Sequence, residues 1–294
     1  MSRRPSAVMP QPRKAVTGAV IRRRLYDRAV EDGSAFAGVR LGYGLWPHQQ
    51  RALAALDTDL ATGGSSTYLV IPPGGGKTLI GLEAARRLAR PTLVLCPNTA
   101  TQAQWIAQWG AAFTPAGTVT ATASRELPTP LTVLTYQAVC TIETGTRAEE
   151  RELPGDRLLE PLHPNGQALL SKLSAHGPWT LVLDECHHLL EMGGRLLSVI
   201  LGRLTDPHVI GLTATPPHMM SAEQKALHRE LFGEVDLEVS APALVRDGRL
   251  APYQELAYFT TPPRPRRNTS TARPSASPRC GPACSTPVRR DLVP

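Results

Sequence analysis

Five consecutive side chains that can bind a metal ion stand out in this sequence: Asp184, Glu185, Cys186, His187 and His188. They follow a short apolar run at residues 181–183. Carboxylate, thiolate and imidazole groups are the usual ligands of zinc, so a zinc site is one hypothesis. Consecutive residues at a strand end point in opposed directions, however, and the sequence has no second group of ligands spaced to complete a tetrahedron. Zinc is therefore disfavoured.

The second chemical motif is a glycine-rich loop at residues 71–78, which directly follows an apolar run and precedes a helical pattern. Glycines in such a loop let backbone N–H groups approach a phosphate, and the N-terminus of the helix adds positive potential. Lys77 can reach the β- and γ-phosphates of ATP, and the Thr78 hydroxyl can hold Mg²⁺. Ile71 replaces the first glycine of G-x-x-x-x-G-K-[ST]. We expect the nucleotide to contact Pro73, Gly74, Gly75, Gly76, Lys77 and Thr78.

A phosphate loop needs a carboxylate on a neighbouring strand, which holds Mg²⁺ from the opposite side. Asp184 is the candidate for this ligand, because it ends an apolar run. Glu185 would then lie beside the metal ion and could activate the attacking water as a general base. We expect Cys186 to pack against the sheet and His188 to begin the next helix. The metal predicted at this cluster is thus Mg²⁺, bound together with ATP.

Short apolar runs predict the strands that position these residues, at 68–71, 92–96, 131–135, 180–183 and 208–212. Helical patterns lie between them, at 78–90, 99–109, 167–175 and 188–203. Strands that are apolar throughout are typical of a sheet buried on both faces. The prediction is an α/β fold, with a parallel sheet and helices on both faces. Trp105 and Trp109 lie one helical turn apart and are expected in the core.

Charge and composition divide the 294 residues into three parts. Residues 1–40 form a basic flank with a helical segment and a charge of +6, residues 41–260 carry −5, and residues 261–294 carry +6. The middle part is the predicted nucleotide-binding domain, and the Pro/Arg-rich end is predicted to be disordered. The basic flanks either bind nucleic acid or are solvated tails. No apolar run is long enough for a membrane span or a secretory signal, so the cytoplasm is expected.

With both motifs present, the chain resembles the first motor domain of superfamily 2 helicases and translocases, the DEAD/DEAH-box group. The resemblance covers about residues 45–260. Trp-Pro-His-Gln at 46–49 is similar to the adenine-sensing element of that family, which implies that Gln49 contacts adenine. The first glycine of the phosphate loop is commonly replaced in the family, as it is at Ile71. The subgroup that includes restriction-enzyme motor subunits is the most similar. The resemblance implies a RecA-like P-loop NTPase fold.

The Asp-Glu-Cys-His sequence at 184–187 resembles the Asp-Glu-x-His box of the same family. Leu-Thr-Ala-Thr-Pro at 212–216 resembles the motif whose hydroxyls couple ATP hydrolysis to movement. This implies that Thr213 and Thr215 are coupling residues and that His187, as part of the catalytic set, leans toward them.

Two more segments, at residues 96–105 and 134–137, are similar to the motifs that line the nucleic-acid track of these helicases. The resemblance therefore implies Mg²⁺-ATP hydrolysis coupled to binding of nucleic acid, with DNA favoured over RNA.

A complete motor of this family has two such domains, and the second supplies arginine fingers that stabilise the transferring phosphoryl group. The sequence after Thr260 is too short and too poor in apolar residues for a second sheet, which would fit a truncated or frameshifted gene product. We therefore expect impaired turnover by this chain alone, and a protein partner that supplies the second motor domain. The alternative is a non-catalytic module that binds nucleotide and nucleic acid together with a partner.

Overall fold

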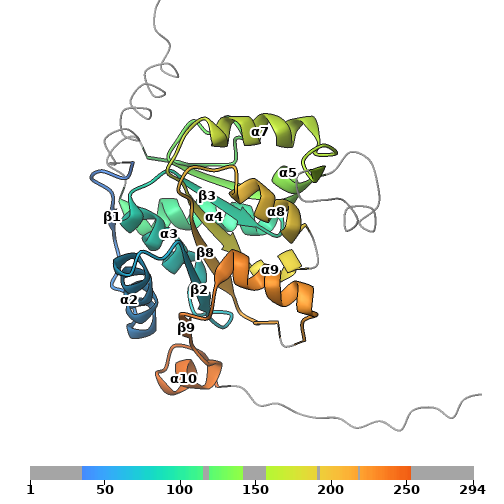
Figure 1. Cartoon of the computed structure of the whole chain (residues 1–294). Coiled ribbons are helices and arrows are strands. Elements are labelled where there is room, and N and C mark those ends of the chain that lie inside the picture. The colour runs from blue at the N-terminus through green and yellow to red at the C-terminus, as the bar shows by residue number, and fades with distance from the viewer. Residues whose placement is uncertain (1–34, 115–118, 142–156, 191–192, 218, 253–294) are drawn as a thin grey trace, which may run out of the picture. The chain divides into compact units, whose positions relative to one another are not determined.

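The computed structural model describes residues 35–114, 119–141, 157–190, 193–217 and 219–252 (Figure 1). Seven parallel strands form one sheet in the order β5-β6-β3-β7-β8-β2-β9. Their bounds are β2 Ser66–Val70, β3 Thr92–Cys96, β5 Ala121–Thr122, β6 Leu131–Thr135, β7 Thr180–Asp184, β8 His208–Thr213 and β9 Leu237–Glu238. Strands β1 (Arg40–Leu41) and β4 (Phe113–Thr114) pair antiparallel in a separate ribbon. The parallel sheet confirms the predicted α/β fold.

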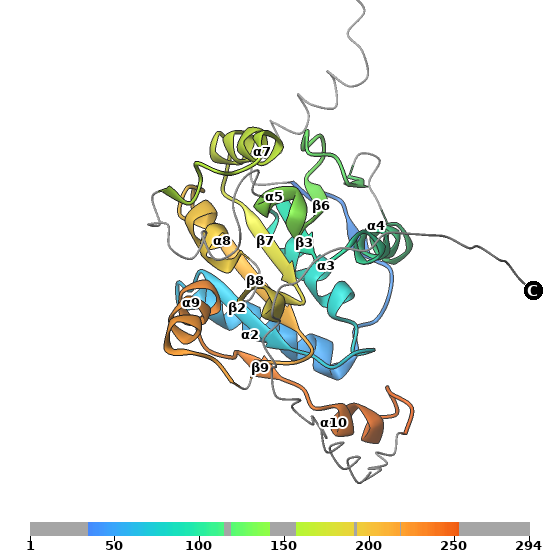
Figure 2. The ribbon, with the colours of Figure 1, turned by 90° about the vertical axis from the view of Figure 1, so that its right-hand side faces the viewer.

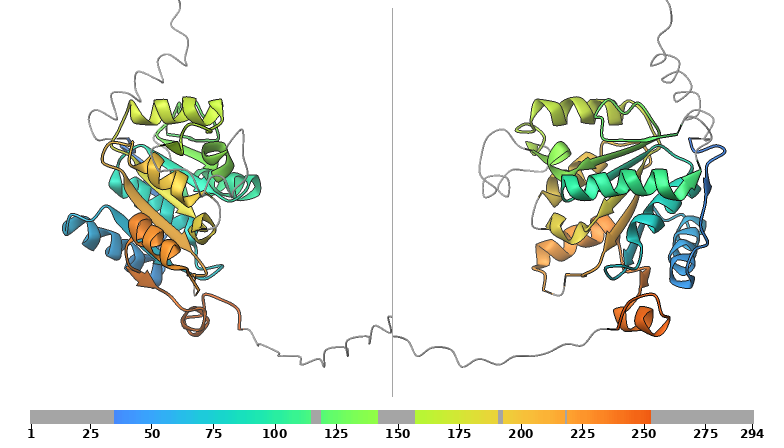
Figure 3. Two further views of the ribbon diagram at one scale, coloured as in Figure 1. Left: turned by 45° about the vertical axis from the view of Figure 1, so that its right-hand side comes forward. Right: turned by 180° about the vertical axis from the view of Figure 1, so that it is seen from behind.

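Helices cover both faces of this sheet. Their bounds are α2 Pro47–Ala61, α3 Lys77–Leu88, α4 Thr99–Ala112, α5 Tyr136–Cys140, α7 Pro164–Ser174, α8 Gly194–Leu201, α9 Ala222–Phe232 and α10 Ala241–Arg246, with a 3₁₀ helix, η2, at Cys186–Leu190. Figure 2 shows α7, α8 and α9 on one side of the strands and α3 and α4 on the other. In the view from behind in Figure 3, α4 lies in front of the strands.

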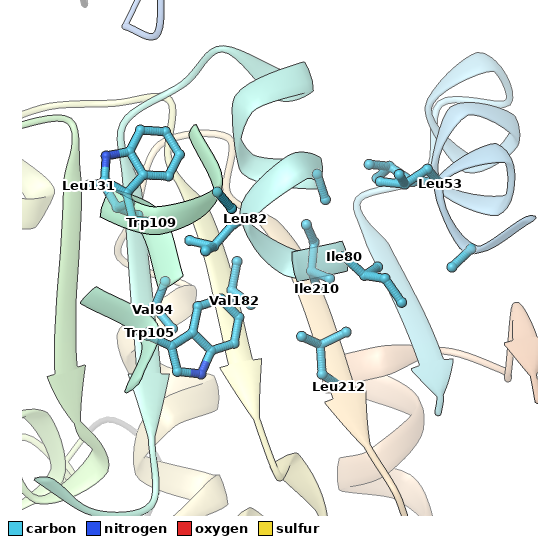
Figure 4. Close-up of a cluster of buried hydrophobic side chains, with 14 of the residues drawn as sticks. Leu53, Ile80, Leu82, Val94, Trp105, Trp109, Leu131, Val182, Ile210 and Leu212 are labelled. Atoms are coloured by element: carbon cyan, nitrogen blue, oxygen red, sulfur yellow. The ribbon is translucent and has the colours of Figure 1, made fainter. Parts of the chain in front are cut away.

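Alternate residues of the buried strands supply two hydrophobic cores. Val94, Val182 and Ile210 face α2, α3 and α4, where Trp105 and Trp109 also pack (Figure 4). The alternate residues of the same strands point to the other face. Those of β3 and β7 at positions 93, 95, 181 and 183, for example, face α5, α7, α8 and α9. Burial of successive residues on opposite faces explains why these strands are apolar throughout. The core positions predicted for the two tryptophans are confirmed, since they are 0% and 3% exposed.

All five predicted strands are present, with ends shifted by no more than two residues. The single helix predicted at 188–203 is wrong, because the structure has η2 and, after a break, α8. Gly193 adopts a left-handed φ of 83° at the N-cap of α8, a conformation that suits glycine and ends a continuous helix. His188 accordingly lies within η2 instead of starting a regular α-helix.

The structure adds elements that the apolar patterns did not predict, among them α2, α9 and α10. Ala35, Phe36 and Val39 pack in the core beside α4. The predicted flank up to residue 34 and the chain from 253 onward, which includes the predicted tail at 261–294, lie outside the described residues. The domain limits at residues 40 and 260 therefore stay predictions. None of the described helices has the length and apolar character that crossing a membrane requires.

We expect the stability of the fold to depend on pH through one buried histidine of the sheet. His208 begins β8, is 2% exposed, and its Nε2 lies 3.3 Å from the Thr67 hydroxyl oxygen of β2. Burial, helped by the charge of Arg90, lowers the pKa of His208 from 6.5 to about 4. The unfolded chain then binds the proton more readily than the folded one. The stability that depends on neutral His208 is complete above about pH 6.5 and is lost as the pH falls toward 4.

We expect His208→Gln to flatten this pH dependence. In the parent chain, the free energy of unfolding should fall by on the order of 2–3 kcal/mol between pH 6.5 and 4 through this residue alone. Urea unfolding at several pH values measures the fall, and the exposed His188→Gln serves as the control. An equally steep fall in His208→Gln would contradict the assignment.

Candidate active site

The predicted site residues gather at one edge of the sheet. The phosphate loop follows β2, the acidic residues end and follow β7, and Thr213 ends β8. Parallel strands that lie side by side have their carboxyl ends at the same edge, which is where ligands bind in such sheets. Strand β8 lies between β2 and β7 in the sheet, so the two nucleotide motifs flank it. The topology thus brings together segments more than 100 residues apart in the sequence.

The phosphate loop has the backbone that its glycines permit. Gly74 and Gly76 have φ angles of 77° and 83°, a left-handed conformation that is costly for other residues. A Cβ atom at Gly76 would lie 2.4 Å from the Nε2 of Gln49, so a side chain there would displace the end of Gln49 as well as strain the backbone. Helix α3 begins at Lys77, directly after this turn. Its free N–H groups therefore face the loop, as an anion site requires.

The first turn of α2 is hydrogen-bonded to the phosphate loop. Gln49 is 3% exposed, accepts a hydrogen bond from the Trp46 N–H at 2.9 Å, and donates to the Gly75 carbonyl oxygen at 3.4 Å. The Nε2 of His48 lies 2.8 Å from that same oxygen. The Arg249 guanidinium lies over the Trp46 ring, 5.1 Å from its centre. His48 was not predicted as a site residue, although it stands beside Gln49 in the recognised motif.

Asp184 is buried and held by Trp105. The indole Nε1–H of Trp105 donates to Asp184 Oδ2 at 2.8 Å, a contact between two residues 79 positions apart. A Cβ at Gly81 of α3 would lie 2.6 Å from the Trp105 ring, so the ring needs a glycine below it. The sequence predicted that Trp105 is buried but gave no signal for its polar contact with the acid.

Glu185 forms an ion pair with the lysine of the phosphate loop. Its Oε1 lies 3.0 Å from Lys77 Nζ, and its Oε2 lies 3.5 Å from Nδ1 of His187. Glu185 has a φ of 50°, in the left-handed region that costs free energy for a residue with a side chain. This bend directs the Glu185 carboxylate toward the phosphate loop.

The remaining side chains of the acidic cluster diverge. His187 Nδ1 lies 2.8 Å from the Thr213 hydroxyl, which also accepts from the Thr215 N–H at 3.2 Å. The predicted approach of His187 to the threonine motif is therefore present. Cys186 is fully buried, as predicted, and His188 is exposed. Because these side chains point to different surroundings, they do not form the tetrahedral arrangement that zinc needs.

A cavity of about 520 Å³ joins the two motifs. The predicted site residues that line it are Gln49, Gly74, Gly76, Lys77, Thr78, Asp184 and Glu185. Pro73 is exposed and Gly75 is buried beneath the loop, and neither lines the cavity, whereas Thr213 and Thr215 are connected to it through His187. Thr78 and Asp184 offer hydroxyl and carboxylate oxygens to the same space, the ligand type that Mg²⁺ prefers. A cavity of this volume is large enough for a nucleotide.

A family model described as Type III restriction enzyme, res subunit (ResIII), matches residues 42–218. This match covers more than half of the chain. The chain belongs to the ResIII family. The matched range contains every predicted site residue, from Gln49 to Thr215, whereas α9 and α10 lie after it. The resemblance to helicase motor domains of the restriction-enzyme kind is thereby confirmed.

Two helicases are among the proteins to which the chain is similar. The chain is 28% identical over 151 residues to the TFIIH basal transcription factor complex helicase/translocase XPB subunit of Trypanosoma brucei brucei, covering 50% of this chain and 15% of that protein. It is 29% identical over 194 residues to the putative DNA 3'-5' helicase Rad25 of Halobacterium salinarum, covering 65% of this chain and 26% of that one. The chain thus spans about a quarter or less of these relatives.

Among solved structures, the helicase domain of Pyrococcus furiosus Hef is similar with a TM-score of 0.43 and 20% identity, over 63% of this chain and 36% of that one. The Type ISP restriction-modification enzyme LlaGI, solved with a DNA substrate mimic, gives a TM-score of 0.45 and 17% identity, over 70% of this chain and 21% of that one.

We expect Asp184 to lower the stability of the folded ResIII domain at neutral pH. Burial raises the pKa of Asp184, and the Trp105 hydrogen bond only partly opposes this. A raised pKa means that the contribution of Asp184 to stability is present below its ordinary value of 3.8 and is lost as the pH rises. Asp184→Asn should therefore raise the melting temperature at pH 7 by about 2–4 °C. Differential scanning fluorimetry checks this, and an unchanged or lower melting temperature would contradict it.

Proposed function

We propose that the chain is the ATP-binding first motor domain of a DNA helicase or translocase, in which Mg²⁺-ATP hydrolysis is coupled to DNA binding. The observation that carries this proposal is the shared cavity. Lys77 and Thr78, from the loop after β2, line it together with Asp184 and Glu185, from the end of β7. ATP chemistry needs a cation at the phosphates, ligands for Mg²⁺ and a base for water within one space. This cavity brings together groups that could fill all three roles.

Each residue has a role that follows from its position. Lys77 would bind the β- and γ-phosphates, and the left-handed glycines let the loop backbone approach them. Thr78 and Asp184 would hold Mg²⁺, which neutralises phosphate charge when bound. Glu185 would accept the proton of the attacking water. His187 would connect Glu185 with Thr213, because it contacts both side chains.

Adenine would bind beside Gln49 and Trp46, which line the cavity next to the loop. Gln49 also binds the Gly75 carbonyl, so adenine contact and loop position are linked in one side chain. We propose Gln49 as the adenine-contacting residue on this basis.

DNA is the proposed nucleic-acid partner because Rad25 is named as a DNA helicase and the ResIII name refers to restriction enzymes. A protein partner would supply a second motor domain, and the cytoplasm is the proposed location. A non-catalytic module that binds nucleotide and nucleic acid is the alternative. Adding a partner domain that supplies arginine fingers separates the two functions. This addition should raise ATP turnover only if Glu185 is a working base.

The test of nucleotide binding uses a fluorescent ATP analogue with Mg²⁺. The parent chain should bind it, and Lys77→Ala should weaken binding by about 100-fold or more, because a charge-assisted phosphate contact is lost. Lys225→Ala, an exposed lysine on α9, is the matched control and should bind normally. Equal affinity of Lys77→Ala and the parent chain would overturn the proposed site.

A further inference from the structure

Two aromatic side chains hold Asp184, the proposed Mg²⁺ ligand, from opposite faces of the sheet. Trp105, from the core beside α4, donates to the Asp184 carboxylate. Tyr136, from the core beside α5, donates its hydroxyl to the backbone carbonyl oxygen of Asp184 at 2.8 Å. Tyr136 is 4% exposed, and burial raises its pKa well above 10, so the hydroxyl keeps its proton. The acid is therefore fixed both at its side chain and at its backbone.

The Tyr136 contact reaches across a neighbouring strand. Tyr136 is the first residue of α5 and follows the last residue of β6. Strand β3 lies between β6 and β7 in the sheet. Adjacent strands are about 4.8 Å apart, so the two strand ends are separated by roughly 10 Å. A long side chain that ends in a donor is needed to span this distance, and the phenol of tyrosine provides it.

The carbonyl that accepts this hydrogen bond belongs to the peptide group between Asp184 and Glu185. Its orientation sets the φ angle of Glu185, which is 50°. Such a conformation persists only where surrounding contacts hold it. Removal of the hydroxyl would leave a buried carbonyl without its donor and would let this peptide group turn. The Glu185 carboxylate would then lose its alignment with Lys77.

We propose that Tyr136 is a positioning residue that holds the Asp184–Glu185 peptide in its left-handed bend and so transmits movements of α5 to the Glu185–Lys77 pair. This inference rests on the proposed function, because it assigns to α5 and the end of β6 an effect on nucleotide binding. In the proposed motor, DNA contacts at this strand end would change nucleotide affinity through the tyrosine hydroxyl. By linkage, nucleotide would change DNA affinity by the same factor.

The test is a binding cycle on the full chain. The affinity for a fluorescent, non-hydrolysable ATP analogue with Mg²⁺ is measured with and without a duplex oligonucleotide that has a single-stranded overhang. In the parent chain, DNA should change this affinity by about fivefold or more. In Tyr136→Phe the change in affinity caused by DNA should fall to less than about twofold.

Tyr68→Phe is the matched control. Tyr68 is 1% exposed, and its hydroxyl has no hydrogen-bond partner in the described ranges. Both substitutions remove one buried hydroxyl, but only the Tyr136 hydroxyl contacts Asp184. Tyr68→Phe should therefore keep the full effect of DNA. A merely structural role of Tyr136 would lower the melting temperature and leave the effect of DNA on nucleotide affinity unchanged, which would overturn the inference.

Hydrogen–deuterium exchange on the parent chain gives a second measurement that does not depend on how the variant folds. Addition of the analogue should slow exchange in Tyr136–Cys140 together with the residues around Asp184. If the analogue binds and α5 does not respond, the inference is wrong and the nucleotide site stands. If the analogue does not bind the parent chain at all, the proposed function fails first.

Discussion

Glu185→Gln is expected to reduce single-turnover ATP hydrolysis by about 10²- to 10⁴-fold, the usual contribution of a general base. The same substitution should tighten binding of the Mg²⁺-bound ATP analogue, because Lys77 would lose the anionic partner that lies 3.0 Å away. Glutamine retains the size and shape of the side chain but cannot accept the proton of the attacking water. Hydrolysis with the chain in excess over radiolabelled ATP, and a parallel binding titration, measure the two effects.

The control for this prediction is Glu238→Gln, on the edge strand β9 and outside the cavity lining. It should leave both quantities unchanged. Nucleotide affinity lower in Glu185→Gln than in the parent chain would show that the carboxylate binds the nucleotide or its metal ion. Hydrolysis at the parent rate would remove Glu185 from the role of base.

Trp105→Ala is expected to lower the free energy of unfolding by about 3–5 kcal/mol, as for other large aromatic side chains removed from a core. Trp105 is fully buried and packs on Gly81, so its removal leaves a cavity that α3 and α4 cannot easily close. The buried Asp184 carboxylate also loses its indole donor, and this loss adds to the penalty. Urea unfolding monitored by circular dichroism gives the change.

Two substitutions separate packing from the polar contact. Trp105→Phe and Trp109→Phe both keep an aromatic ring in the core, but only the first removes a donor to Asp184, since the Trp109 indole donates to the Val119 carbonyl. Both should lose stability, whereas only Trp105→Phe should also lose Mg²⁺-nucleotide affinity. Gln104→Ala, at an exposed position of the same helix, should change stability by less than about 0.5 kcal/mol. Equal nucleotide affinities in the two Phe variants would show that the Asp184 contact serves stability alone.

The strands and the nucleotide motifs were predictable because their signals are local. The run Thr180–Asp184 is apolar up to its acidic end, and this pattern alone places Asp184 at the carboxyl edge of a buried strand. Lys77 and Thr78 follow a strand and open a helix, so their position at the turn between the two follows from the sequence of the loop. The partner of His187 was predictable only through the family resemblance, because Thr213 lies 26 residues away.

Other parts of the site depend on packing between distant segments. The hydroxyl of Tyr136 reaches Asp184 across an intervening strand, and the pattern of apolar residues in β6 does not specify strand order. The left-handed backbone of Glu185 is also invisible in the sequence, since glutamate has no preference for it. The error at 188–203 arose because helical periodicity continues through Gly193, whose conformation interrupts the helix.

The side chains that line the proposed nucleotide cavity bear on which form of the nucleotide binds there. Among the described residues, the acidic and basic side chains that line it are Lys77, Asp184 and Glu185, which are one base and two acids. Such a lining is expected to favour a nucleotide whose charge a divalent ion has already reduced over the free polyanion. The ion pair between Lys77 and Glu185 should increase this preference, because a phosphate without a metal ion would have to compete with Glu185 for the Lys77 ammonium group. We therefore expect the proposed site to bind the Mg²⁺ complex of a nucleotide more tightly than the free anion.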